Sequence, residues 1–204
     1  YSPDGTRLWV EETDFYVGIR TQTLDGDDNI YLAGTDDKFT VVKLDSQGIF
    51  QWRYRHADPN VGIASDLAID GDGNVIAVGR MQYPFYDDDD WSNYAVVKLD
   101  PAGDLIWDWI YAGDPEPLYS HASSVVVDEQ NDIFTTGWGE PAMEPEHNGR
   151  NQEEMRYITA SLSSDGDLEW MSEFDFGPDM ERTSAYELFF DSIGNLFVAG
   201  DTME

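Results

Sequence analysis

Short apolar runs recur along the chain, and clusters of Gly, Asp, Asn and Ser separate them. In one kind of run, such as residues 29–34 and 74–79, nearly every position is apolar. In another kind, such as residues 39–44 and 94–99, an aromatic residue is followed by small or branched side chains. Runs of this length between turn-forming residues are typical of β-strands. Because a strand with two apolar faces must be covered on both sides, we expect these strands to lie between neighbouring sheets.

The runs belong to a unit that occurs four times. Its first anchor is an Asp, followed by Asn or Asp and then by Gly at fixed spacing: Asp25/Asn29/Gly34, Asp70/Asn74/Gly79, Asp128/Asp132/Gly137 and Asp191/Asn195/Gly200. Its second anchor is Gly-x-x-x-Trp, found at Gly5/Trp9, Gly48/Trp52, Gly103/Trp107 and Gly166/Trp170. Residues that recur in every copy are interpreted as scaffold. The same holds for Lys43 and Lys98, which share one position of the repeat.

Each unit contains four strand-like stretches, which we name strands A to D in chain order. Strand A ends at the first Asp, strand B runs from the Asn to the Gly, strand C begins with an aromatic residue, and strand D carries the Trp. The A–B and C–D links are rich in Gly, Asn and Asp, which is typical of tight hairpin turns. Each unit is therefore expected to be a four-stranded antiparallel sheet.

Small sheets of this kind, repeated every 45 to 63 residues, predict an all-β chain with a β-propeller fold. The predicted blades span residues 21–56, 65–111 and 123–176. Partial blades are expected at residues 1–12, with a strand D at 6–12, and at residues 186–204, with strands A and B at 186–200. We thus expect a single domain over residues 1–204 that forms an arc of a propeller and is a segment of a longer chain.

The repeat pattern also carries a family resemblance. The sequence Asp-x-x-Gly-Asn-aliphatic-x-x-Ala-Gly, followed by Tyr-x-Val-x-Lys-Leu-Asp-x-x-Gly-x-aliphatic-x-Trp, resembles the bacterial β-propeller repeats labelled SBBP, and more distantly the quinoprotein-type (PQQ-like) repeats. The resemblance covers essentially the whole chain. It implies a propeller in a secreted or cell-surface protein, and no cofactor-binding residue of the quinoproteins can be carried over onto this chain.

The connection between strands B and C varies most in length. From the strand B Gly to the strand C aromatic residue, the spacing is 5, 15 and 20 residues in the three copies. Because A–B and C–D turns leave a meander on one side, the B–C and D–A connections share the opposite face, and variable loops on a rigid scaffold are frequent binding sites. The candidate binding residues are Tyr83, Phe85, Tyr86, Trp91, Trp138 and His147. They favour contacts with a glycan or a protein; the alternative is that they cover the ends of the blades.

The net charge of the chain limits which kinds of partner it can bind. The net charge of −31, from 42 acidic and 11 basic residues, argues against nucleic acid and anionic lipid, since both are polyanions. No apolar run is long enough to insert into a membrane. There is no cysteine, and the three histidines His56, His121 and His147 are too scattered to predict zinc.

Calcium is the one cofactor that the composition favours. The acidic run Asp87, Asp88, Asp89 and Asp90 is the candidate cation site, because calcium prefers clustered carboxylate oxygens. The Asp-x-Asp-x-Asn starts at Asp25 and Asp70 also resemble a metal loop, but the later ligand positions do not match, so turn caps are the simpler interpretation.

The expected function is therefore that of a non-catalytic binding or structural module of a secreted or cell-surface protein, with contacts on the B–C and D–A loop face. Two alternatives stay open: a propeller that binds or cleaves carbohydrate, and a calcium-assisted adhesion or assembly module that self-assembles. No catalytic pair can be chosen among 42 carboxylates.

Overall fold

The structure, a computed structural model, describes residues 2–7, 9–10, 12–57, 61–82, 92–112, 118–141, 155–175 and 182–203. Every regular element in these residues is a strand, so none is a helix that could span a membrane. The first sheet contains β1 (Gly18–Leu24), β2 (Ile30–Thr35), β3 (Phe39–Leu44) and β4 (Phe50–Arg55); the second contains β5 (Val61–Ile69), β6 (Val75–Gln82), β7 (Asn93–Leu99) and β8 (Leu105–Tyr111). The third contains β9 (Leu118–Val127), β10 (Ile133–Pro141), β11 (Arg156–Leu162) and β12 (Leu168–Phe174), and β13 (Arg182–Phe190) pairs with β14 (Leu196–Met203).

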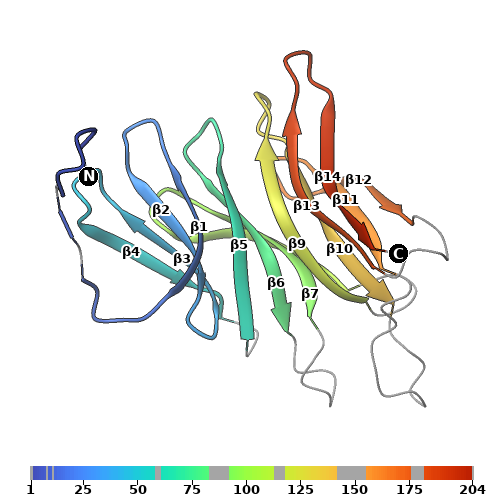
Figure 1. The fold of residues 1–204 in the computed structure, drawn as a ribbon, viewed down its shortest axis with the longest axis horizontal. Coiled ribbons are helices and arrows are strands. Elements are labelled where there is room, and N and C mark those ends of the chain that lie inside the picture. Colours follow the sequence, from blue (N-terminus) through green and yellow to red (C-terminus); the bar gives the residue numbers. More distant parts are fainter. Residues whose placement is uncertain are drawn as a thin grey trace.

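These sheets are propeller-type blades, which confirms the predicted all-β fold class. All neighbouring strands are antiparallel, and within each blade they follow chain order, with β1, β5, β9 and β13 as strand A. The blades follow one another along the molecule, with the N-terminus at one end and the C-terminus at the other (Figure 1). The strands A are neighbours, since β5 lies against β1 and β9, and β9 lies against β13. They form the inner row of the arc.

The core lies between the blades. One cluster of buried side chains joins the first and second sheets and includes Tyr31, Phe39, Val41, Leu67, Val75, Met81 and Val97. A second cluster joins the second and third sheets and includes Ile76, Tyr94, Val96, Ile133, Ile158 and Leu162. Strand β7 is buried at every position, and β6 is buried at most of its positions. The central sheet therefore has two dry faces, as the apolar runs predict.

The Gly-x-x-x-Trp anchor joins one blade to the next. Three turn glycines have a φ between +83° and +90°, and each lies beneath the tryptophan of the preceding unit: Gly48 beneath Trp9, Gly103 beneath Trp52 and Gly166 beneath Trp107. A Cβ on these glycines would lie 2.6 to 2.8 Å from the nearest ring carbon. Glycine is needed here twice, because the backbone conformation is left-handed and because the ring occupies the side-chain space.

Two elements differ from the sequence prediction. No strand forms in the described residues 2–7, 9–10 and 12–17, although a strand D was expected at residues 6–12. A strand D pairs with strand C of its own blade, and no such strand lies beside this segment among the described residues. The inner strands also begin earlier than the predicted starts of their blades at residues 65 and 123, since β5 begins at Val61 and β9 at Leu118. They continue beyond a β-bulge, which interrupts the apolar alternation on which the prediction depended.

Candidate functional site

The repeated Asp of the A–B turns is a structural residue. In the second blade, the Asp70 carboxylate accepts hydrogen bonds from the backbone N–H of Asp72 and Asn74, at 3.0 and 2.8 Å, and from the Asn74 side chain at 2.9 Å. Its second oxygen lies 3.0 Å from Lys98 Nζ. Burial alone would raise the pKa of Asp70, but the hydrogen bonds from Asn74 and Lys98 outweigh it and lower the pKa. The oxygens are thus already engaged by protein groups, as expected of a turn cap.

The described residues offer no candidate metal site. Within them, no group of three or more His, Asp or Glu side chains is placed to hold an ion. The acidic run Asp87, Asp88, Asp89 and Asp90 lies outside the described residues, so calcium binding there stays a prediction.

A β-bulge occurs at the same position in every strand A. One residue of each inner strand is left without a cross-strand partner: Arg20, Ser65, Ser123 and Tyr186. Opposite each bulge lies the strand B glycine of the repeat, namely Gly34, Gly79, Gly137 and Gly200. A Cβ on these glycines would lie only 1.9 to 2.1 Å from a backbone carbonyl oxygen of strand A. The glycine anchor is therefore what permits the bulge.

The bulged side chain differs between the blades, although the backbone arrangement around it is the same. The flanking residue on strand B is always Gly, whereas the bulged residue is Arg, Ser, Ser or Tyr. Bulges are common beside functional sites because they redirect a side chain at a fixed point of a sheet. The inner strands are therefore the part of this fold where the repeats differ in chemistry at a structurally constrained position.

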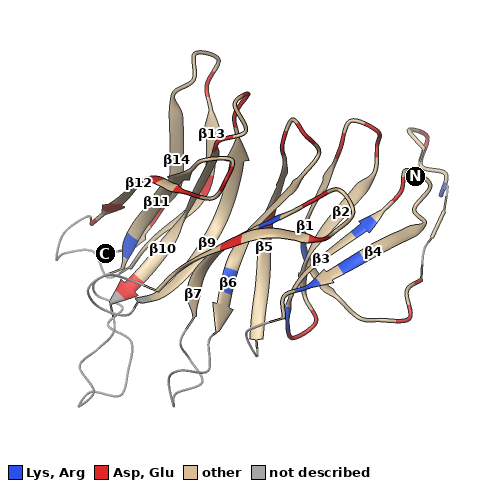
Figure 2. Cartoon of the chain, turned by 180° about the vertical axis from the view of Figure 1, so that it is seen from behind, with Lys and Arg blue, Asp and Glu red and all other residues tan. Residues whose placement is uncertain are grey.

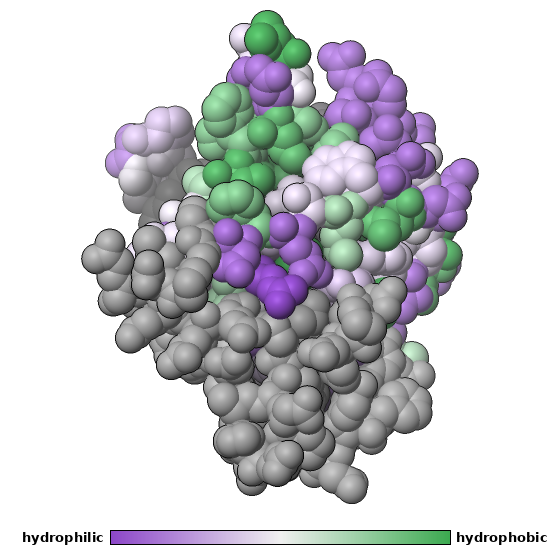
Figure 3. Space-filling model, turned by 90° about the vertical axis from the view of Figure 1, so that its right-hand side faces the viewer, coloured by the Kyte–Doolittle hydropathy of each residue, from purple (hydrophilic) through white to green (hydrophobic). Residues whose placement is uncertain are grey.

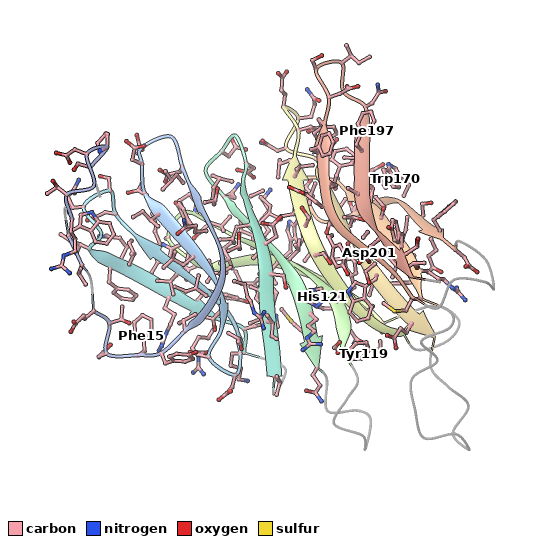
Figure 4. All side chains as sticks on the ribbon, viewed as in Figure 1. Phe15, Tyr119, His121, Trp170, Phe197 and Asp201 are labelled. Atoms are coloured by element: carbon pink, nitrogen blue, oxygen red, sulfur yellow. The ribbon has the colours of Figure 1, made fainter. Side chains whose placement is uncertain are left out.

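One bulged residue contacts the next blade. Ser65 Oγ lies 3.0 Å from His121 Nε2 on β9. The His121 ring stacks on Trp138 of β10, with ring centroids 5.8 Å apart and an interplanar angle of 8°. Tyr119 lies 5.4 Å from the same Trp138 ring, and Arg80 of β6 donates a hydrogen bond to the Tyr119 hydroxyl. We call Ser65, Arg80, Tyr119, His121 and Trp138 the inner-strand cluster; Tyr119 and His121 are labelled in Figure 4.

The inner-strand cluster contains an arginine, Arg80, that is not in a carboxylate ion pair within the described residues. Asp and Glu gather on the turns, whereas the few Lys and Arg lie mainly within the strands (Figure 2). In the described part of the chain, three arginines form carboxylate ion pairs: Arg53 and Arg55 with Asp36, and Arg156 with Glu173. No such pair is formed there by Arg80 or by Arg20, the bulged residue of β1. The cluster also borders one buried carboxylate, Glu140, which is in register with Tyr119.

His121 is held neutral. Burial lowers the pKa of His121 to about 4, and the positive charges of Arg80 and Arg20 act in the same direction. The imidazole is therefore uncharged at neutral pH and retains an acceptor nitrogen, so that Ser65 can donate its hydroxyl proton to Nε2. What the cluster offers a ligand is then the Arg80 guanidinium group, a serine hydroxyl and aromatic surface, and Arg20 adds a second positive charge near enough to act on His121.

This titration predicts a loss of stability in weak acid. Because the folded pKa of about 4 lies below the unfolded value of about 6.5, the unfolded state binds a proton first as the pH falls. The contribution of neutral His121 is complete above pH 6.5 and is lost between pH 6.5 and 4, by up to about 3 kcal/mol. Urea unfolding across this range should show the decline in wild type and a flatter profile in His121→Gln. Equal slopes in both proteins would contradict this prediction.

The structure places the predicted binding residues as follows. Trp138 lies in β10 and belongs to the inner-strand cluster, packed against His121 rather than extending from a loop. The other candidates, Tyr83, Phe85, Tyr86, Trp91 and His147, lie outside the described residues, so their ligand contacts stay predictions. Strand β10 ends at Pro141, three residues after Trp138, so the cluster lies near the loop face on which binding was predicted (Figure 1).

Four members of the inner-strand cluster were not among the predicted binding residues: Ser65, Arg80, Tyr119 and His121. Their contacts cross between blades, and Ser65 and His121 are 56 residues apart. One signal was present: the strand B glycine is the same in all four copies, whereas the strand A position that forms the bulge opposite it is Arg, Ser, Ser or Tyr.

Comparisons with known proteins bear on the fold. No family model matches the chain, and no curated protein matches its sequence. A solved structure of a protein of unknown function from Bacteroides caccae is similar, with a TM-score of 0.55 and 10% identity, over 94% of this chain and 56% of that one. XC5397, a gluconolactonase from Xanthomonas campestris, matches with a TM-score of 0.39 and 14% identity, over 89% of this chain and 69% of its own, which is too low a score to support an argument. The class defined by fold and comparison is thus that of propeller-like proteins built from four-stranded blades, and this chain spans about half of the Bacteroides caccae protein.

Proposed function

We propose that the chain is a non-catalytic binding module of the β-propeller type, which holds a single anionic group of its ligand at the inner-strand cluster. The observation that supports this is the state of Arg20 and Arg80. With 42 acidic residues in the chain, carboxylate partners are abundant, yet neither arginine is in an ion pair within the described residues. A guanidinium group without a carboxylate partner, beside other donors, is a good binding group for a carboxylate.

The charge of the whole molecule limits the ligand. A net charge of −31 repels polyanions, so a molecule with many negative charges would bind poorly despite the two arginines. A mostly neutral molecule with one carboxylate avoids this repulsion and can use the local positive charge. Among the partners favoured by the sequence, a glycan with an acidic sugar fits best, because aromatic residues suit sugar rings.

The proposal also includes the repeat family of the chain and its location in the cell. The repeat pattern supports the SBBP-type repeat family, and the propeller fold is consistent with it. The Lys-poor, acidic composition supports a secreted or cell-surface location, where a protein partner is the alternative to a glycan.

Comparing the binding of glucuronate with that of glucose separates the contribution of the negative charge from that of the sugar ring. In calorimetric titrations at low ionic strength, glucuronate should bind saturably and glucose should bind at least about 10-fold more weakly, since a hydrogen bond to a charged group is worth about 1.5 to 3 kcal/mol. Arg80→Gln should weaken glucuronate binding by a similar factor, because it removes a charged donor. Arg53→Gln is the matched control, since Arg53 is paired with Asp36 and should leave binding unchanged.

Three results would contradict the proposal: no saturable binding of glucuronate, equal binding of the two sugars, or an equal effect of the two arginine variants.

A further inference from the structure

The last strand is exposed although its sequence is that of a buried strand. β14 is the strand B of its unit, equivalent to β2, β6 and β10. Phe197 is 49% exposed, whereas Tyr31 and Ile76 at the same repeat position are 1% and 0% exposed. The sequence thus specifies a covered strand, and the structure shows it uncovered.

The exposed surface extends beyond β14. Large apolar side chains that are 43 to 56% exposed lie on the neighbouring strands of this end of the molecule: Trp170, Phe174, Tyr186 and Phe189. Figure 3 shows hydrophobic side chains gathered on this end, and Figure 4 places Trp170 and Phe197 there. Monomeric proteins rarely leave a contiguous apolar surface of this kind open unless it is a contact site.

The backbone edge of β14 is also open. In the second blade, the corresponding edge of β6 pairs with β7, from Val75 opposite Leu99 to Gly79 opposite Ala95. Among the described residues, β14 pairs only with β13. An open edge with apolar side chains is a template for another strand.

Trp170 indicates what kind of element would fit this edge. Trp52 and Trp107 each lie over the turn glycine of the next blade, at Gly103 and Gly166. Trp170 occupies the same position in the third blade, but the described residues contain no turn for it to cover. At this end of the molecule the tryptophan half of the interface between blades is therefore present, and the described residues do not supply the turn-glycine half.

We propose that the β14 edge and Trp170 form an acceptor site for one further β-hairpin of the strand C–turn–strand D type, supplied by another copy of this repeat. Its strand C pairs with β14 from Leu196 to Gly200, and its turn glycine lies beneath Trp170. The hairpin reproduces the contacts that β7 and β8 make with β6 and Trp52.

A second copy of this chain is a poorer occupant. Its N-terminal segment does offer a C–D type turn, in which Ser2 N–H bonds to Thr6 O and Gly5 has a φ of +83° with nothing within 4 Å of its Cβ position. However, the residues after this turn correspond to strand D of the repeat, and the edge of a strand B pairs with strand C, as β6 pairs with β7. This segment supplies the turn without strand C.

The test appends a copy of residues 93–111 after residue 204 through a short Gly/Ser linker. The linker can be short because residues 36–38 alone join β2 to β3. We expect the melting temperature to rise by about 4 °C or more and the emission of Trp170 to shift to shorter wavelength, because the hairpin buries the open edge.

The matched control carries Gly103→Val in the appended copy only. Its Cβ would meet the Trp170 ring, as a Cβ on Gly103 itself would meet Trp52 at 2.6 Å, so most of the temperature rise should disappear. Trp170→Ala should likewise remove more stability from the extended chain than from the original one. An unchanged melting temperature, or a rise that neither substitution reduces, overturns the proposal. So does a dimer of the original chain that Trp170→Ala dissociates, because a second copy would then be the occupant.

Discussion

Gly79→Ala should destabilise the protein by about 3 kcal/mol or more, which is the upper end of the usual cost of overpacking. The new Cβ would lie 2.0 Å from the backbone oxygen of Ile63, and backbone atoms cannot move away without separating β5 from β6. Both strands belong to the buried central sheet, so no local displacement relieves the clash. Urea unfolding followed by circular dichroism measures the loss.

Two other glycines provide the comparison. Gly26→Ala adds the same methyl group where nothing lies within 4 Å, and it should change the unfolding free energy by no more than about 0.5 kcal/mol. Gly200→Ala creates the same clash as Gly79→Ala, at 2.1 Å from Ser184 O, but in the exposed two-stranded sheet. It should cost less, because β14 can shift locally. If Gly79→Ala and Gly26→Ala have equal effects, the bulge does not require glycine.

Lys98→Met should have an effect of similar size, about 3 to 5 kcal/mol at neutral pH, because it leaves a buried charge without its partner. The Lys98 and Asp70 side chains are 5% and 0% exposed, and their charged atoms are 3.0 Å apart. Methionine retains the length and the apolar part of the side chain, so the loss reports on the charge. Thermal and urea unfolding should both show it, and Asp70→Asn in the same protein should recover part of it.

Lys43→Met is the matched control for this charge. Lys43 has the same repeat position in the first blade, but its ammonium group lies 4.9 Å above the Tyr31 ring instead of in a buried ion pair. Its loss should cost about 1 kcal/mol or less. Equal effects of the two substitutions would show that the buried pair is not what stabilises the second blade.

Much of the blade architecture could be predicted from the sequence, because strands B, C and D are coded locally. The run at 94–99 predicted β7, which the structure places at Asn93–Leu99. The inner strands were predicted too short because the bulges shift the alternation of side chains by one residue, and a pattern with a period of two cannot be followed through such a shift. Trp138 was placed in the B–C connection because strand B was taken to end at the repeat Gly, whereas β10 continues past Gly137 to Pro141 opposite the first part of β9.

The candidate site could not be predicted in the same way. Ser65 and His121 are brought together by the packing of two blades, and no spacing along the chain records which residues of different blades will meet. The prediction instead followed loop length and composition, and of the residues that it named, Trp138 is the one that the structure places in the inner-strand cluster. The strand B glycine was recognised as an anchor, yet its reason, the close approach of a carbonyl oxygen, depends on the bulge opposite it.

The pairing of a tryptophan with the glycine of the following blade has a consequence for how such proteins change in evolution. Each unit carries one half of the joint with its predecessor and one half of the joint with its successor. Duplication or deletion of a whole unit therefore leaves every junction matched, and no compensating mutation is required. Chains of this type can gain or lose blades in single genetic steps, while the residues on their inner strands diverge independently.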